Sequence, residues 1–292
     1  SSGPFLAAQD GGLEEFEEMT GIKVNLELYE FQEAIDKINI NAAGGGDAID
    51  VITYRPIQET QTWYANGYFA PLNDYIAEAG DEYDYEDFFP AAREVTTVNG
   101  DIVGIPYLTE GEILWYNTEL FEQYDATVPE TFDELLETAE KLYDPANNVY
   151  GISLRGEGNS AVTQFSGFLY GFGGDFYDED LNATMNTPEA LQALEYYADL
   201  CAYGPDGAPS ASQADGINWF NTGITAMRID AYAQEWNHSN PETSLIYDKL
   251  GHANFPKGPV GEYTPYNVVA WAMGVSATSK NQDAAWEFIE WL

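Results

Sequence analysis

The sequence predicts an α/β protein whose sheets are mainly parallel. Segments with the apolar spacing of amphipathic helices alternate along the chain with short apolar segments typical of strands. At 292 residues the chain is long enough for two domains, each with its own core. Apolar residues make up 45% of the chain, which is too many for a disordered protein.

The first quarter of the chain contains two helix signals and two strand signals. "LEEFEEMTG" (13–21) predicts a helix that ends at its glycine, and "IKVNLELY" (22–29) alternates in the manner of a strand. "QEAIDKININ" (32–41) predicts a second helix that runs into a glycine-rich turn. "IDVITY" (49–54) is a short apolar segment of the kind found in buried parallel strands.

The middle of the chain carries more specific turn and cap signals. "TTVNGDIVGIPY" (96–107) predicts a hairpin that turns at Asn99-Gly100. In "PETFDELLETAEKLYD" (129–144), Thr131 is placed to cap a helix and Glu134 to complete a capping box. The apolar stripe of this helix is expected at Leu135, Ala139 and Leu142.

Two further helices are predicted in the second half. "NTPEALQALEYYADL" (186–200) has Thr187 as its cap and Pro188 at its first helical position. Its apolar stripe is expected at Leu191, Leu194, Ala198 and Cys201. Cys201 is therefore interpreted as a buried small hydrophobe rather than a nucleophile. "KNQDAAWEFIEWL" (280–292) predicts a last helix, with Ala285, Phe288, Ile289 and Leu292 on one face.

The chain is extremely acidic, with 50 Asp and Glu against 10 Lys and Arg and a formal net charge of −40. Such a polyanion is not expected to bind nucleic acid, because binding would bring two like-charged surfaces together. The acidic residues are spread along the whole chain rather than gathered in a tail, which favours adaptation of the surface to high salt. A specific acidic function, such as cation storage, is the alternative.

Signals for enzymes, metals and cofactors are weak. The chain has no nucleophile elbow, phosphate-binding loop or zinc-protease motif, and its one cysteine excludes an intrachain disulfide. The two histidines, His238 and His252, lack ligand-like neighbours, so we expect no metal and no cofactor. Sequons at Asn182 and Asn237 permit glycosylation if the chain is exported.

Aromatic residues make up 15% of the chain, and many lie beside polar residues in predicted loops. Sugars and polyols present apolar C–H faces and rims of hydroxyls, so their sites need aromatic faces and charged or amide groups. "PYLTEGEILWYN" (106–117) combines these features, because it begins with a proline and places Glu110 among apolar and aromatic residues. Ordinary core packing is the competing interpretation for most of the aromatics.

Six segments, in order, resemble the extracellular solute-binding proteins of ABC importers, in the sugar-binding group that includes maltose-binding protein. They are "FEEMTGIKVNLELYEF", "IDVITYRPIQETQTWYANGYFAPLNDYI", "GDIVGIPYLTEGEILWYNTELFEQYDATVPETFDELLETAEKL", "WFNTGITAMRIDA", "NFPKGPVG" and "GVSATSKNQDAAWEFIEWL".

The resemblance implies a two-lobed periplasmic-binding-protein-like fold of type II, with the ligand cleft between the lobes. Residues 1–107 and 259–292 are expected to form the first lobe and residues 108–258 the second. Crossovers are expected near 106–109 and 254–258. The chain is then expected to be a monomer that delivers a sugar or polyol to permease subunits in the membrane.

The resemblance also places substrate-binding residues. Glu110 matches a sugar-contacting glutamate, although pairing with a nearby Arg or Lys is the alternative. The other ligand-contacting residues that it implies are Tyr54, Arg55, Arg155, Asn159, Asp230, Tyr232 and Trp271. Arg155 has a structural alternative as well, since it could pair with one of the fifty acids.

Two departures from the family pattern concern the ends of the chain. The family's first strand, its lipid-bearing cysteine and its last helices have no counterpart, so the chain is expected to be a mature or trimmed fragment of a cell-surface-anchored extracellular lipoprotein. Two other functions are kept as alternatives: a carbohydrate-active enzyme, which needs two facing carboxylates, and a binding protein for a non-sugar solute.

Overall fold

The computed structural model describes residues 11–29, 31–260 and 269–292, and the chain divides into two compact units. Unit 1 comprises residues 1–109 and 269–292, and unit 2 comprises residues 110–268. Among the described residues, no helix has both the length and the apolar composition needed to span a bilayer.

Unit 1 is built on a three-stranded sheet in the order β1-β9-β4, with a separate hairpin of β2 and β3. Its strands are β1 (Val51–Tyr54), β2 (Thr97–Val98), β3 (Asp101–Ile102), β4 (Ile105–Glu110) and β9 (Val269–Val275). Its helices are α2 (Leu13–Thr20), α3 (Phe31–Ala43), α4 (Pro56–Ala65), α5 (Asn73–Ala79), α6 (Pro90–Val95) and α13 (Gln282–Trp291), with short 3-10 turns at Gly80–Glu82 and Tyr85–Asp87.

Helices cover both faces of the unit 1 sheet. Along β9, Ala272 belongs to a core cluster that includes Ile35 of α3 and Trp63 of α4. The next residue, Met273, belongs to a second cluster with Trp286 of α13. Because successive strand residues point to opposite faces, these two clusters lie on opposite sides of the sheet.

Unit 2 is built on a four-stranded sheet in the order β6-β7-β5-β8. Its strands are β5 (Glu112–Asn117), β6 (Tyr150–Ser153), β7 (Thr225–Ala231) and β8 (Leu250–Ala253). Its helices are α7 (Thr118–Gln123), α8 (Phe132–Lys141), α9 (Gly158–Gly171), α10 (Pro188–Cys201), α11 (Gln213–Asn221) and α12 (Glu235–His238), with 3-10 turns at Pro145–Asn147, Ala208–Ser210 and Tyr232–Gln234.

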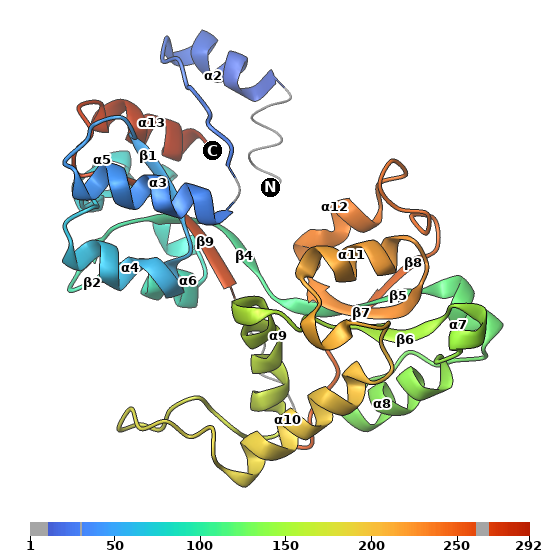
Figure 1. The fold of residues 1–292 in the computed structure, drawn as a ribbon. Helices are drawn as coiled ribbons and strands as arrows, with labels where there is room; N and C mark the ends of the chain where they lie inside the picture. Colours follow the sequence, from blue (N-terminus) through green and yellow to red (C-terminus); the bar gives the residue numbers. More distant parts are fainter. Residues whose placement is uncertain (1–10, 30, 261–268) are drawn as a thin grey trace. The chain divides into compact units, whose positions relative to one another are not determined.

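The unit 2 sheet is also covered on both faces (Figure 1). Leu114 of β5 lies in a large cluster with apolar residues of α8, α9 and α10. Trp115, which follows it, packs instead against Phe220 of α11 and against Ile246. The alternation along β5 thus separates the face that packs against α8, α9 and α10 from the face that packs against α11.

The cap and turn predictions are confirmed. Gly21 closes α2 in the left-handed conformation, and Thr131 and Glu134 form a capping box at α8. Thr187 caps α10 with Pro188 in its first turn. In the hairpin, Asn99 and Gly100 both have positive φ, and Val98 pairs with Asp101, as a two-residue turn requires.

Two strand predictions are wrong. Residues 22–29 form no strand, because no neighbouring strand in the described residues completes a ladder. Ile22, Val24 and Leu26 are nevertheless less exposed than the residues between them. β1 exists, but it pairs antiparallel with β9. The prediction of mainly parallel sheets is therefore wrong: the unit 2 sheet is mixed, since β5 is antiparallel to β7 and β8, and β6 is parallel to β7.

Two details of the predicted helix faces are also wrong. Leu191 and Leu194 are more than half exposed and Ala198 is exposed as well, whereas α10 buries Ala190, Ala193, Tyr196, Tyr197 and Leu200. The aromatic face fills the core of unit 2 better than the leucine stripe does, because Tyr196 stacks on Phe132 of α8. Cys201 is half-buried, and Leu292 is 39% exposed at the end of the last helix.

The second crossover was expected near 254–258, whereas the division of the chain into two units assigns these residues to unit 2. Lys257 forms an isolated parallel β-bridge with Thr131 of unit 2, and the Val260 amide donates a hydrogen bond to Gly171 O of α9 at 3.3 Å. These residues remain packed on unit 2, whose range extends to residue 268.

Candidate functional site

Three strand ends meet at one edge of the unit 2 sheet. β6 and β7 run parallel, so both end at this edge, and antiparallel β5 begins there. Glu112 lies opposite Ala231, and Arg155 follows two residues after the end of β6. The edge therefore brings charged side chains together from three separate parts of the sequence.

A buried ion-pair cluster occupies this edge. Asp230 is fully buried, and its two carboxylate oxygens accept from two guanidiniums, Oδ1 from Arg155 Nη2 and Oδ2 from Arg228 Nη2. The Ala231 amide donates to Oδ1 at 2.9 Å, and Gln213 Nε2 lies at 3.3 Å. Burial alone raises the pKa of Asp230, but the two guanidiniums overcome it and hold the pKa well below its usual range.

Neighbouring residues hold the two arginines in place. Gln164 Oε1 accepts from the Arg155 amide at 2.7 Å and from the Tyr197 hydroxyl at 2.9 Å, and that hydroxyl also donates to Arg155 O at 2.6 Å. Arg228 packs closely beneath α11 at Gly216, where a Cβ would lie 1.9 Å from Arg228 Nη1. The position of Arg155 is thus set from α9 and α10, and that of Arg228 from α11.

A second carboxyl lies beside this cluster. Glu112 is buried, and neither of its oxygens has a hydrogen-bond partner among the described residues. Burial raises the pKa of Glu112 to about 7, against the opposing effect of the Arg155 guanidinium. Glu112 is therefore largely protonated below neutral pH, unlike Asp230.

Four of the eight predicted site residues lie together at or next to this edge of unit 2. They are Glu110, Arg155, Asp230 and Tyr232. The Tyr232 amide donates to Gly111 O at 3.1 Å, and burial and the Glu110 carboxylate raise the pKa of Tyr232. Tyr232 is 43% exposed, so part of its side chain is open to a ligand.

The remaining predicted residues are placed differently. Tyr54 is fully buried in unit 1, where its ring packs against Trp63 and Phe69. Arg55 precedes α4 and donates to Glu59 at 2.7 Å, and Trp271 is a half-buried residue of β9. Asn159 lies in the first turn of α9, and its side chain is outside the described part of the structure.

Arg228 and Glu112 were not predicted from the sequence as site residues. A signal for Arg228 was present, because it and Asp230 are two residues apart in "TAMRIDA", and charges at that spacing share one face of a strand. A charged pair inside a strand whose seven residues are all buried indicates an internal network. Glu112 carries no such local signal in a chain with 50 acids.

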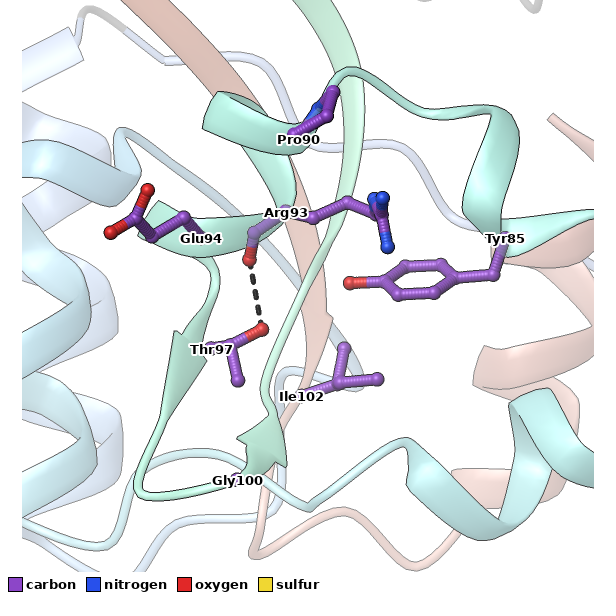
Figure 2. Close-up of a pocket in the computed structure, with 7 residues that line it drawn as sticks. All are labelled: Tyr85, Pro90, Arg93, Glu94, Thr97, Gly100 and Ile102. Carbon is purple, nitrogen blue, oxygen red and sulfur yellow. Dashed lines mark hydrogen bonds between the residues drawn. The ribbon is translucent and has the colours of Figure 1, made fainter.

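The structure has a surface pocket away from this ion-pair cluster, in unit 1, and another at the margin of the cluster, in unit 2. Figure 2 shows one in unit 1, with a volume of about 470 Å³, between the β2–β3 hairpin and α6, where the Arg93 guanidinium lies near the Tyr85 ring. The other, of about 440 Å³, lies between α9 and α10 of unit 2 and includes Arg155 and Tyr197 in a mostly apolar lining. Among the described residues, no cluster of three His, Cys, Asp or Glu has a geometry suited to a metal ion.

Comparison with known proteins gives matches over nearly the whole chain. Residues 2–292 match the family described as bacterial extracellular solute-binding protein. The chain is 28% identical over 260 residues to the mannitol-binding protein of Pseudomonas aeruginosa, covering 87% of this chain and 58% of that protein. It is 28% identical to the erythritol/L-threitol-binding protein of Mycolicibacterium smegmatis, covering 99% of this chain and 64% of that protein.

A solved structure shows the same relationship. The chain superimposes with a TM-score of 0.84 and 30% identity on an ABC transporter solute-binding protein from Agrobacterium vitis S4 with bound D-mannitol, covering 98% of this chain and 69% of that chain. This likeness confirms the predicted type II fold. The chain spans less than two thirds of the length of the two curated relatives.

Proposed function

Because the chain belongs to the bacterial extracellular solute-binding protein family, we propose that it captures a sugar or polyol for an ABC importer. The observation that carries the proposal is the Arg155–Asp230 pair beside the partly exposed Tyr232. The buried Asp230 carboxylate holds the Arg155 guanidinium in place as a donor to a ligand hydroxyl, and the Tyr232 ring offers a face to the C–H groups of the ligand.

A linear polyol is the ligand class that we favour. The two curated relatives are named for mannitol and for erythritol and L-threitol, and the similar solved structure holds D-mannitol. The proposed contact residues are Glu110, Arg155, Asp230 and Tyr232 in unit 2, with Arg55, Asn159 and Trp271 in addition. The burial of Tyr54 argues for a packing role at that position.

The family also indicates the setting in which the chain acts. An extracellular location follows from the family, and we propose permease subunits as the membrane partner and a lipid anchor for the full-length protein. The relatives named above are binding proteins, which supports a binding function over a carbohydrate-active enzyme.

A ligand screen tests the proposed function. Mannitol, ribitol, erythritol and maltose are screened, and a compound that binds would stabilise the folded state by ~2.7 kcal/mol at about 100 times its dissociation constant. We expect at least one of them to raise the melting temperature by roughly 5 °C or more, with glycine and sodium phosphate as non-sugar controls. A response to the controls alone would favour the non-sugar alternative, and new products after incubation with oligosaccharides would favour an enzyme.

Salt dependence tests the proposal that the acidic surface is adapted to high salt. With a net charge of −40, self-repulsion destabilises the folded state at low ionic strength, and 1 M salt screens charges beyond ~3 Å. We expect the melting temperature to rise steadily from 0.05 to 2 M KCl. A flat or falling curve in KCl would contradict the proposed adaptation.

A further inference from the structure

Two carboxyl groups on opposite faces of the unit 2 sheet, Asp230 and Glu112, act electrostatically on Arg155. The register pairs Ile113 with Asp230, so Asp230 shares the α11 face with Ile113. Glu112 precedes Ile113 and therefore points to the other face, which α9 and α10 cover. Arg155 follows the end of β6 at the sheet edge, where the charges of both Asp230 and Glu112 act on it.

Only one of these two carboxyl groups is bonded to Arg155. Asp230 accepts from the guanidinium, whereas both Glu112 oxygens are buried without a hydrogen-bond partner among the described residues. The Nε atoms of Arg155 and Arg228 also lack partners there. Buried polar groups nearly always have hydrogen-bond partners, so a carboxyl left without one beside two guanidiniums requires an explanation.

We propose that Glu112 is a positioning residue for the ligand site of unit 2, an inference that rests on the proposed function. As a neutral carboxyl, Glu112 leaves the Arg155 guanidinium bound to Asp230, in the arrangement that receives a ligand hydroxyl. As a carboxylate, it competes with Asp230 for Arg155 across the sheet edge and weakens that arrangement.

The charges around Glu112 allow this competition near neutral pH. Arg155 and Arg228 are cationic and Asp230 is anionic, so the cluster carries one net positive charge while Glu112 is neutral and none when it ionises. Burial raises the pKa of Tyr197 well above its usual value, and burial lowers the pKa of His238 to about 4, so neither titrates between pH 5.5 and 8.5. Glu112 is then the group of this cluster that changes charge in that window.

The experiment compares the pH profile of ligand affinity in the wild type and in Glu112→Gln. D-mannitol is titrated by calorimetry at 2 M KCl between pH 6 and 8.5. We expect the wild-type Kd to rise about tenfold over this range. The largest possible rise is ~30-fold, which would occur if only the protein with protonated Glu112 bound the ligand. Because glutamine cannot ionise, the Kd of the variant should change less than about twofold and match the low-pH wild type.

The control is Glu137→Gln, which removes the same charge from an exposed position of α8 and should keep the wild-type slope. A residue with only a structural role would change the melting temperature without changing the slope of affinity against pH. If Glu112→Gln does not fold, Glu112→Leu carries the same expectation.

Three results would overturn the inference. A wild-type Kd that is constant across the range would show that ionisation of Glu112 does not affect binding, whether or not the variants fold. A slope retained in Glu112→Gln would assign the pH dependence to another group. Mannitol binding with a flat profile overturns the positioning role alone, whereas a lack of polyol binding at every pH overturns the proposed function with it.

Discussion

Replacing Asp230 with alanine is expected to lower the free energy of unfolding by about 3–5 kcal/mol. The substitution leaves the guanidiniums of Arg155 and Arg228 buried without their shared counter-charge. This loss is several times the effect of an ordinary surface substitution. Urea unfolding, followed by tryptophan fluorescence at constant KCl, measures it.

The matched control is Asp199→Ala, at an exposed position of α10, which should change stability by less than ~0.5 kcal/mol. Combining Asp230→Ala with Arg228→Met removes one unpaired cation and should recover part of the loss. If Asp230→Ala lowers the free energy of unfolding by less than about 1 kcal/mol, the Asp230 carboxylate is not needed to stabilise the two buried guanidiniums.

The pH dependence of the Asp230 contribution has a defined sign. Its pKa is lower in the folded state than its usual value of 3.8, so its stabilising effect is fully present above that value. The effect decreases as the pH falls through the folded pKa. The difference in free energy of unfolding between wild type and Asp230→Ala should therefore be largest at pH 7 and become smaller as the pH falls below 3.8.

Replacing Glu110 with alanine is expected to weaken ligand binding by roughly tenfold to a hundredfold. The reason is that a carboxylate accepting from ligand hydroxyls makes charge-assisted bonds worth ~1.5 to 3 kcal/mol. Glu110 ends β4 and is only half-buried, so the unliganded fold should lose little stability. Calorimetric titration of the best polyol, with melting curves taken without ligand, measures both effects.

The same pair of measurements tests the structural alternative for Glu110. If the side chain serves mainly to pair with a neighbouring cation, Glu110→Ala will retain its affinity and melt at a lower temperature without ligand. Glu110→Gln separates charge from hydrogen bonding, because the amide still accepts a bond but carries no charge.

Local features of the fold were predictable from the sequence because their causes are local. The capping box of Thr131 and Glu134 and the turn at Asn99-Gly100 depend on hydrogen bonds and backbone angles within a few residues. The absence of a strand at 22–29 and the antiparallel pairing of β1 with β9 were not predictable, because a ladder depends on which segment lies alongside.

The candidate site divides in a similar way. Arg155 and Asp230 were predicted through the family resemblance, and the structure brings them into one ion pair. Arg228 and Glu112 escaped prediction, because their importance comes from burial and from the sheet register rather than from their neighbours in sequence. The prediction of which face of α10 is buried was wrong for the same reason, because tertiary packing buries the side of the helix that carries Tyr196 and Tyr197.

The division of unit 1 into two stretches of chain has a consequence for the order in which the protein folds during synthesis. All four strands of unit 2 have been made once residue 253 has left the ribosome, so that unit can complete its sheet early. β1 must wait for its partner β9, which is made last among the described strands. Until then the apolar side chains of β1 remain exposed, and chaperones that bind nascent chains would encounter unit 1 rather than unit 2.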